Sequence, residues 1–407
     1  MDRSLVPWPV VGTDSTRTPR ILAALAAALD GTGPALAPTA GSPEPLPGRV
    51  PADVALAVRT SGSTGAPRRV LLGGVALRAS AERTHARLGG PGRWVLALPL
   101  DHVAGLQVLV RSVVARTTPV LTGTSPESVA SAVRSLGTSR APTADGQPAS
   151  RLYTALVPTQ LHRIVQESTG GELPERLAPL RHLDAILVGG AGTPDALRRA
   201  ALDLGLPVVT TYGMTETCGG CVYDGVPLDG VRVEVDDGVV RIAGPTLAAG
   251  YLVDGQVRST GFDEDADGTR WFRTSDLGRI DARGRLTVLG RHDDVLVTGG
   301  VKVAPAAVEN VLSQVVGVAQ VCVVGVPDRE WGTSVTAVVV PTPQGPPDLA
   351  GLREAVTRTL GSAAAPRDLV LVRSLPQRGP GKVDRAAVAR LAVREVGPPD
   401  PEGTGSA

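Results

Sequence analysis

The sequence predicts an α/β protein. We expect a large N-terminal domain of layered α/β subdomains with a small β region, followed by a smaller α+β C-terminal domain on a hinge. Three observations predict this fold class. Apolar strand patterns alternate with a helix pattern between residues 183 and 213, short β-like segments begin near Val231, and the segment after Arg291 has its own succession of helices and strands.

The composition is that of a soluble globular chain with room for two or three domains. Of its 407 residues, 42% are hydrophobic and 20% charged, and 41 basic residues balance 40 acidic ones. This balance argues against nucleic acid or an anionic membrane surface as a partner. The longest early apolar run, 21–29, is too short to span a bilayer and has no basic leader. We therefore expect a cytoplasmic protein without membrane insertion.

The N-terminal elements follow from start and stop signals. A Thr-Pro pair precedes the apolar run 21–29, which ends at Gly31 and predicts a helix. The Pro-rich segments 33–48 and 138–150 predict surface loops. The stretch 70–77, VLLGGVAL, predicts a strand.

The middle of the chain predicts a strand–helix–strand unit. Short apolar runs over 183–192 and 206–213 flank a helix pattern, with Thr193 as the expected N-cap and Pro194 at the first helical position. This order predicts parallel strands. Ligands bind at the carboxyl ends of such strands.

The C-terminal segment predicts a domain of its own. We place the boundaries at 1–290 for the N-terminal domain and 291–396 for the C-terminal domain, with a disordered tail over 397–407. The expected elements of the C-terminal domain are helices over 304–315 and 348–361 and strands over 319–327, 333–341 and 368–372.

Lysine usage singles out two positions. Only Lys302 and Lys382 are lysines, which leaves 39 arginines among the 41 basic residues. A chain that uses arginine for surface charge keeps lysine where a compact, flexible ammonium is needed. The alternative is that the two lysines have no special role.

The stretch RTSGSTGAPRRV, residues 59–70, can be interpreted in two ways. Small residues with free N–H groups and hydroxyls can wrap a phosphate, and Arg68 could neutralise it. The same composition fits a linker. The Walker pattern is excluded, because it needs a lysine after the last glycine and a helix behind it.

Four further stretches carry groups for nucleotide chemistry. In TTYGMTET, Tyr212 could lie against a base, Thr215 offers a hydroxyl, and Glu216 offers a carboxylate for a hard cation. On an expected turn, Asp276 could accept hydrogen bonds from ribose. Lys382 lies at the tip of a Gly-Pro loop. The alternatives are that Tyr212 is a half-buried tyrosine of a turn and that Asp276 is a solvated aspartate. The fourth stretch is GRHDD, at the domain boundary.

In their order along the chain, these stretches resemble the signature motifs of the acyl-adenylate-forming, AMP-binding enzymes, a family that includes acyl-CoA synthetases, adenylation domains and luciferases. The likeness extends from Val54 to Val388. It implies ATP, Mg²⁺ and coenzyme A as cofactors. The implied reaction joins a carboxylic acid to AMP with release of pyrophosphate, after which a thiol takes the acyl group.

The resemblance also implies a role for each matching residue. Lys382 would bridge the carboxylate and the α-phosphate, Thr215 would bond the α-phosphate, Glu216 would hold Mg²⁺, and Asp293 would be the hinge. Arg68 replaces the usual lysine of the phosphate loop. The implied cofactor-binding residues are Thr60, Ser61, Gly62, Ser63, Thr64, Gly65, Arg68, Gly190, Thr211, Tyr212, Gly213, Met214, Thr215, Asp276, Arg291, Gly300 and Lys302.

Three stretches, 98–113, 156–164 and 226–235, resemble the o-succinylbenzoyl-CoA synthetases of menaquinone biosynthesis in their short high-GC bacterial form. This implies an acid with a second carboxylate. The implied acid-binding residues are His102, which we also count as catalytic, Arg111 and Gly189. The alternatives are a structural histidine for His102 and a surface position for Arg111.

The sequence therefore leaves three candidate functions: an o-succinylbenzoate–CoA ligase, another aryl or medium-chain acyl-CoA ligase, and a nucleotide-binding module without turnover. The expected partners are the acid, ATP and CoA, with a homodimer as the expected assembly. Intact Glu216, Asp276 and Lys382 argue against the third function, because a binder has no need of the bridging lysine.

Overall fold

The structure is a computed structural model. It describes residues 2–10, 15–39, 46, 48–60, 68–137, 151–168, 171–378 and 382–397. The predicted phosphate-loop residues Ser61, Gly62, Ser63, Thr64 and Gly65, the predicted loop 138–150 and the predicted tail after 397 lie outside the described residues.

A strand–helix–strand unit in the middle of the chain sets the frame for the site. Strand β9 (Ala185–Val188) pairs in parallel with β10 (Val208–Met214), and α6 (Asp195–Asp203) connects them. This confirms the parallel unit. The predicted cap is wrong: the N-cap is Pro194, not Thr193, because Pro194 has a ψ of 141° and lies outside the helix.

These strands belong to a seven-stranded sheet of order β12-β11-β10-β9-β8-β6-β7. Helices α2 and α3 pack on one face, and α4, α5 and α6 pack on the other. The further elements are β6 (Gly92–Leu96), β7 (Val120–Leu121), β8 (Arg151–Leu156), β11 (Gly219–Tyr223), β12 (Val226–Pro227), α2 (Gly74–Arg87), α3 (Val103–Val114), α4 (Pro126–Ser135) and α5 (Pro158–Gln166).

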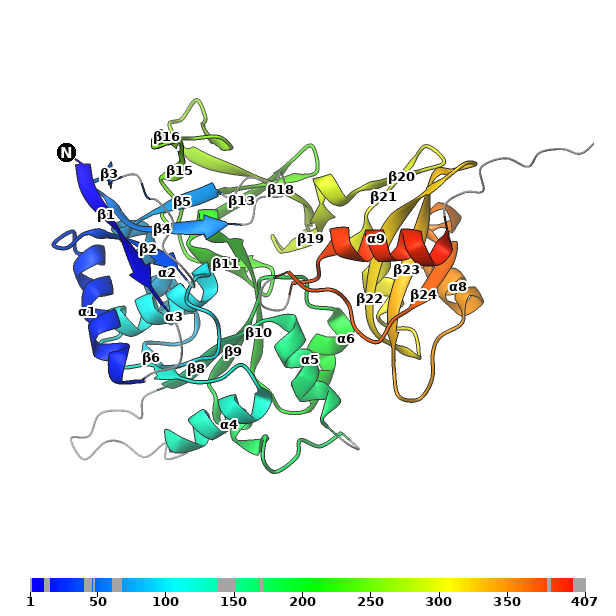
Figure 1. Cartoon of the computed structure of the whole chain (residues 1–407), viewed down its shortest axis with the longest axis horizontal. Helices are drawn as coiled ribbons and strands as arrows, with labels where there is room; N and C mark the ends of the chain where they lie inside the picture. The colour runs from blue at the N-terminus through cyan, green and yellow to red at the C-terminus, as the bar shows by residue number, and fades with distance from the viewer. Residues whose placement is uncertain are drawn as a thin grey trace, which may run out of the picture.

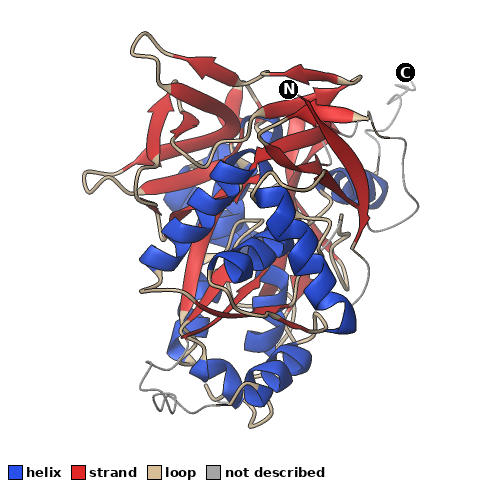
Figure 2. Cartoon of the chain, turned by 90° about the vertical axis from the view of Figure 1, so that its left-hand side faces the viewer, coloured by secondary structure: helices blue, strands red, loops and turns tan. Residues whose placement is uncertain are grey.

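A second seven-stranded sheet, of order β16-β15-β5-β4-β2-β1-β3, packs on the other side of α2, so this helix lies between the two sheets. Figure 2 shows strands gathered above a helix-rich middle. The elements are β1 (Asp2–Pro9), β2 (Ala35–Thr39), β3 (Arg49–Pro51), β4 (Val54–Thr60), β5 (Arg68–Gly73), β15 (Gly250–Val253), β16 (Gln256–Arg258) and α1 (Thr18–Leu29).

Two sequence predictions are wrong in this sheet. The segment 33–48, expected as a loop, contains β2, because Ala35, Leu36 and Ala37 are buried beside β1 and β4. The strand expected over 70–77 ends at Gly73, which is the N-cap of α2. A Cβ on Gly74 would stand 2.4 Å from the Leu29 carbonyl oxygen, so the start of α2 requires a glycine there.

A smaller β region follows, as predicted. Its strands are β13 (Arg232–Asp236), β14 (Val239–Ala243), β17 (Phe262–Glu264), β18 (Arg270–Ile280) and β19 (Leu286–Arg291), in the order β13-β14-β18-β17 with β19 paired to β18. We call residues 2–291 the N-terminal unit.

The C-terminal unit, residues 296–397, contains the predicted helices and strands and is the right-hand part of Figure 1. A sheet of order β22-β23-β24 has α7 and α8 on one face and α9 on the other. The elements are β20 (Leu296–Thr298), β21 (Val301–Val303), α7 (Pro305–Leu312), β22 (Val318–Asp328), β23 (Gly332–Pro341), α8 (Leu349–Leu360), β24 (Asp368–Leu371) and α9 (Arg385–Val396).

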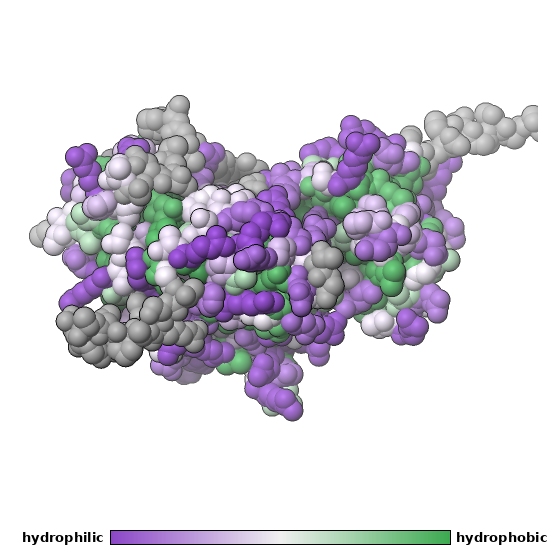
Figure 3. All heavy atoms as spheres, turned by 90° about the horizontal axis from the view of Figure 1, so that it is seen from below, coloured by the Kyte–Doolittle hydropathy of each residue, from purple (hydrophilic) through white to green (hydrophobic). Residues whose placement is uncertain are grey.

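The surface agrees with the balanced composition. Seen from below, hydrophilic side chains cover much of both units, and apolar residues form separate patches between them (Figure 3). In the part of the chain that the structure describes, no helix has the length and apolar character needed to cross a membrane.

Candidate functional site

Strands β10 and β18 bring a tyrosine and an aspartate together. The Tyr212 hydroxyl donates to Asp276 Oδ2 at 2.8 Å, and Asp276 pairs with Arg291 of β19 in the sheet register. Asp276 was expected on a turn, but it lies in a strand, where its N–H donates to Thr274 Oγ1 at 3.0 Å. Burial raises the pKa of Asp276. Burial and the neighbouring carboxylate raise the pKa of Tyr212, so its phenol remains a donor.

A second tyrosine holds Glu216. This residue lies in the 3-10 turn Thr215–Thr217, directly after β10. The Tyr251 hydroxyl of β15 donates to Glu216 Oε1 at 2.9 Å, while Oε2 has no hydrogen bond to a described residue. Burial and the Glu216 charge raise the pKa of Tyr251. Sequence reasoning missed Tyr251. The only sequence feature that could have pointed to Tyr251 is the rarity of tyrosine, since the chain has four.

Lys382 approaches this group from the C-terminal unit. Its Cε lies 3.9 Å from the position that a Cβ on Gly190 would take. Although part of its side chain is exposed, burial and nearby arginines, Arg291 among them, lower the pKa of Lys382. The charges of Glu216 and Asp276 act in the opposite direction. We call Tyr212, Glu216, Asp276, Arg291 and Lys382 the Lys382 group.

The Lys382 group lies where β9 and β10 end, which is the edge at which parallel sheets bind ligands. Two carboxylates face two cationic side chains there. Glu216 keeps one oxygen available for a cation, and Mg²⁺ typically takes one or two protein carboxylates together with phosphate oxygens. Within the described ranges, no three His, Cys, Asp or Glu side chains gather as a metal site. A cation bound jointly with phosphates therefore fits the residues present.

The predicted phosphate loop connects two strands beside this group. Thr60 ends β4 and pairs with Arg68 of β5, and the Thr60 hydroxyl donates to the Arg68 carbonyl oxygen at 3.4 Å. The Arg68 guanidinium lies 5.7 Å from the ring centre of Tyr251. The base of the loop thus contacts the partner of Glu216.

Glycines keep the end of β9 open. A Cβ on Gly189 would stand 2.3 Å from Thr211 Oγ1, and Gly190 has a φ of +84°, which favours glycine. These two residues and Thr211 therefore border the position of Lys382. The turn after β10 contains the remaining predicted residues Gly213, Met214 and Thr215.

Two of the three acid-binding candidates lie at helix α3: His102 at its N-cap and Arg111 within it. His102 is exposed at its N-cap, 3.8 Å from Asp101. Arg111 is only 4% exposed, so a surface position is wrong. Its guanidinium lies 4.9 Å from the Trp94 ring centre and donates to the Tyr223 hydroxyl at 3.4 Å, and burial lowers its pKa. Among the described contacts, neither candidate bonds to the Lys382 group.

The boundary between the units contains the predicted hinge. Asp293 lies in the 3-10 turn His292–Asp294 and accepts a hydrogen bond from Arg291 at 3.3 Å. Gly300 and Lys302 lie on the β20–β21 hairpin, which packs on β23. Figure 1 places this hairpin away from β10, so the structure does not bring Gly300 and Lys302 to the Lys382 group.

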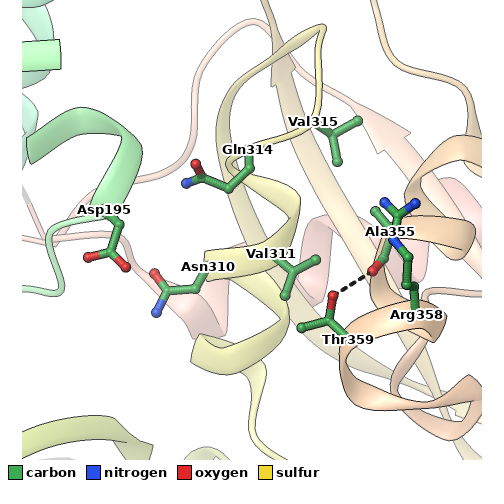
Figure 4. A pocket seen from close by; sticks show the side chains of 8 residues that line it. All are labelled: Asp195, Asn310, Val311, Gln314, Val315, Ala355, Arg358 and Thr359. Atoms are coloured by element: carbon green, nitrogen blue, oxygen red, sulfur yellow. Dashed lines mark hydrogen bonds between the residues drawn. The ribbon is translucent and has the colours of Figure 1, made fainter. Parts of the chain in front are cut away.

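A groove of about 410 Å³ separates α6 from α7 and α8. Figure 4 shows Asp195 of α6 across from Asn310 of α7, with Gln314 nearby. At this boundary, Arg199 of α6 donates to Gln314 Oε1 at 2.6 Å. None of these residues was predicted from the sequence, because surface polar residues carry no signal of a contact between units.

Comparisons with known proteins point to one family. The family model described as "AMP-binding enzyme" matches residues 11–252, and the model described as "AMP-binding enzyme C-terminal domain" matches residues 307–382. The chain is 44% identical over 393 residues to a "Probable 2-succinylbenzoate--CoA ligase" of Mycobacterium tuberculosis, a match that covers 93% of this chain and 97% of that protein.

Two other similarities broaden the comparison. An indoleacetate–CoA ligase of Aromatoleum aromaticum is 30% identical, over 83% of this chain and 67% of its own length. The solved structure of o-succinylbenzoate CoA synthetase from Bacillus subtilis, in complex with the acyl-adenylate intermediate, superposes with a TM-score of 0.68. It covers 93% of this chain and 82% of that chain at 24% identity, which supports the fold.

Proposed function

The chain belongs to the AMP-binding enzymes, and from this membership we propose that it is an ATP-dependent acid–CoA ligase acting on o-succinylbenzoate in menaquinone (vitamin K2) biosynthesis. The observation that carries the proposal is the approach of Lys382 to Gly190, near Glu216 and Asp276. The identity with the mycobacterial relative, which extends over almost all of both chains, supports this acid.

In the first half-reaction, a carboxylate oxygen of the acid attacks the α-phosphorus of ATP. The bond from that phosphorus to the bridging oxygen breaks, and pyrophosphate leaves. Both reactants are anionic, so a lysine ammonium between them lowers their repulsion and stabilises the charge of the transition state. Lys382 has this role in the proposal, and the Thr215 hydroxyl bonds the α-phosphate.

The nucleotide is held by the N-terminal unit. The Tyr212 ring lies against the adenine, and Asp276 accepts hydrogen bonds from the ribose hydroxyls together with Arg291. Because Tyr212 occupies Oδ2 of Asp276, Oδ1 is the oxygen available for ribose. Glu216 would hold Mg²⁺, which neutralises charge on the departing phosphates when bound. The segment from Thr60 to Arg68 cradles those phosphates.

The second carboxylate of the acid is assigned to Arg111. Its guanidinium is buried, its Nε has no hydrogen-bond partner, and no described carboxylate pairs with it. A buried cation without an anion is costly, so an anionic substrate group would stabilise it. His102 and Gly189 complete the proposed acid site.

The second half-reaction uses the thiol of CoA. The thiolate attacks the acyl carbon of the adenylate, AMP leaves, and the thiol proton passes to solvent. In the proposal, the C-terminal domain (291–396) turns about Asp293 after adenylation, which removes Lys382 and brings Gly300 and Lys302 toward the pantetheine arm. A cytoplasmic homodimer completes the proposal.

The decisive experiment measures pyrophosphate release with a panel of acids. Release with o-succinylbenzoate but not with benzoate, indoleacetate or octanoate supports the proposal. The second candidate, another aryl or medium-chain ligase, is favoured by the indoleacetate–CoA ligase relative and predicts the reverse preference. Absence of release with every acid contradicts both ligase functions.

Arg111→Gln sharpens this test. We expect KM for o-succinylbenzoate to rise about 100-fold, because a charge-assisted contact with the second carboxylate is lost, while monocarboxylates keep their basal rate. Arg116→Gln, at an exposed arginine directly after the end of the same helix, is the matched control. Equal losses for mono- and dicarboxylates would contradict the assignment of Arg111.

A further inference from the structure

Tyr251 connects three parts of the site that are distant in sequence. Its hydroxyl donates to Glu216 Oε1 at 2.9 Å, and its ring lies 5.7 Å from the Arg68 guanidinium. In the sheet, Tyr251 pairs with Val70 of β5, the strand that leaves the phosphate loop. One buried side chain therefore links the carboxylate that fits a cation to the base of the loop that would hold the phosphates.

The support behind Tyr251 uses both phenylalanines of the chain. Phe262 lies 5.9 Å from the Tyr251 ring centre and 4.7 Å from Phe272. All three are less than 9% exposed. In a chain with two phenylalanines and four tyrosines, this concentration of aromatic side chains makes the ring hard to displace.

The backbone beside Tyr251 is braced as well. The Ala248 N–H donates to the Glu216 carbonyl oxygen at 2.8 Å, so Glu216 is tied to this segment through both backbone and side chain. Arg270 donates to the carbonyl oxygens of Ala248 and Ala249 at 2.8 and 2.9 Å, and its guanidinium lies 4.4 Å from the Phe262 ring centre.

We propose that Tyr251 is a positioning residue for adenylation: it occupies Oε1 of Glu216 and so directs Oε2 toward the cation that accompanies ATP. This inference rests on the proposed function. A free carboxylate must lose rotational freedom when it binds a cation, whereas one already held by a hydroxyl loses less. Because Tyr251 pairs with β5, it would also keep the Glu216 carboxylate at a fixed position relative to the phosphates.

The test compares Tyr251→Phe with the native chain in two measurements. The first is calorimetric binding of Mg²⁺·ATP and of metal-free ATP with a chelator present. The second is the Mg²⁺ concentration that gives half-maximal pyrophosphate release. We expect the variant to bind Mg²⁺·ATP about tenfold more weakly and metal-free ATP with unchanged affinity, because only the cation contact depends on Glu216. Half-maximal release should need about tenfold more Mg²⁺.

Tyr153→Phe is the matched control. It removes the hydroxyl of another buried tyrosine, one that donates to the carbonyl oxygens of Leu88 and Gly90 far from Glu216 in sequence. It should leave both Mg²⁺ measurements unchanged. In a Glu216→Gln background, Tyr251→Phe should cause no further loss of Mg²⁺·ATP affinity, because the two residues act as one unit.

Equal weakening of Mg²⁺·ATP and metal-free ATP would overturn the inference, as would an additive loss in the double variant. The binding measurement also separates this inference from the proposed function. A native chain that binds Mg²⁺·ATP but releases no pyrophosphate with any acid contradicts the ligase function, while the comparison between the tyrosine variants still decides the role of Tyr251.

Discussion

The two halves of the site are built differently. In the N-terminal unit, Glu216 and Asp276 each accept a hydrogen bond from a largely buried tyrosine, so both carboxylates are fixed before any ligand binds. The Lys382 side chain forms no hydrogen bond or ion pair with a described residue, and its place is set by the backbone, where Arg378 N–H donates to its carbonyl oxygen at 2.7 Å. One half is preorganised, and the other, which we call the delivered half because the C-terminal unit supplies it, is not.

Within the C-terminal unit, contacts of Arg385 hold the segment that follows Lys382. Arg385, which begins α9, pairs with both oxygens of Glu309 at 2.7 and 3.2 Å and donates to the Val323 carbonyl oxygen at 2.5 Å. The Arg385 Nε also lies 3.4 Å from Asp294 Oδ2 in the predicted hinge turn. The segment of Lys382 and the end of the predicted hinge turn are thus joined to the C-terminal unit, so a rotation of that unit would move the lysine with it.

Lys382→Ala should produce the largest effect, because it removes the delivered charge and leaves the preorganised half intact. We expect pyrophosphate release to fall on the order of 10³-fold, with thioester formation from a preformed adenylate largely kept. Lys302→Ala, the other lysine, is the matched control and should spare pyrophosphate release. Equal loss of both half-reactions in Lys382→Ala would contradict the assigned role.

Asp293→Pro tests whether delivery requires a turning hinge. A proline fixes φ near −65° and restricts the residue before it, so the turn should lose its freedom to rotate. We expect pyrophosphate release within about twofold of the native value and thioester formation reduced about 100-fold or more. Asp293→Ala removes the hydrogen bond from Arg291 but leaves the turn free to rotate, so we expect only a small effect on either half-reaction. A normal thioester yield from the proline variant would show that rotation is unnecessary.

The N-terminal unit also contains a buried histidine that should make the stability of the protein depend on pH. His85 of α2 is buried and accepts a hydrogen bond from Trp94, and burial together with the charge of Arg111 lowers its pKa to about 4. Between this value and the unfolded pKa of about 6.5, the unfolded chain binds more protons. Stability is therefore lost as pH falls from 6.5 to 4, by up to about 3 kcal/mol from this residue.

Urea unfolding at pH 7 and pH 4.5 measures this contribution. His85→Gln keeps an acceptor for Trp94 but no titrating group, so the variant should lose less stability on acidification than the native chain. His182→Gln, at an exposed histidine, should behave like the native chain. Parallel losses in all three proteins would contradict the buried, neutral state of His85.

The smallest effect concerns the contact between the units. Arg199→Ala removes the hydrogen bond to Gln314, which is formed in the arrangement that brings Lys382 to Gly190. We expect pyrophosphate release to fall about two- to fivefold, since an exposed hydrogen bond is worth little. Thioester formation should be unchanged or faster. Arg279→Ala, at an exposed arginine of β18, is the control. A selective loss of thioester formation would mean that the contact belongs instead to the arrangement in which the thioester forms.

Local patterns predicted the strand–helix–strand unit and the elements of the C-terminal unit, because apolar periodicity and end signals act over a few residues. The same reasoning failed at β2, since burial between two neighbouring strands overrode an Ala- and Pro-rich composition typical of a loop. It also put Asp276 on a turn, because a polar run in a strand looks like a loop until its partners are known.

The sequence alone determined the family and the types of groups that the site needs: two carboxylates, a lysine kept among arginines, and glycines at the end of a strand. Only the tertiary structure decided which groups meet. The Tyr251–Glu216 hydrogen bond joins two sheets, and the approach of Lys382 to Gly190 joins the two units. The burial of Arg111 depends on Trp94 and Tyr223, which are distant from it in sequence. Such contacts depend on packing across long sequence separations, for which no local pattern carries a signal.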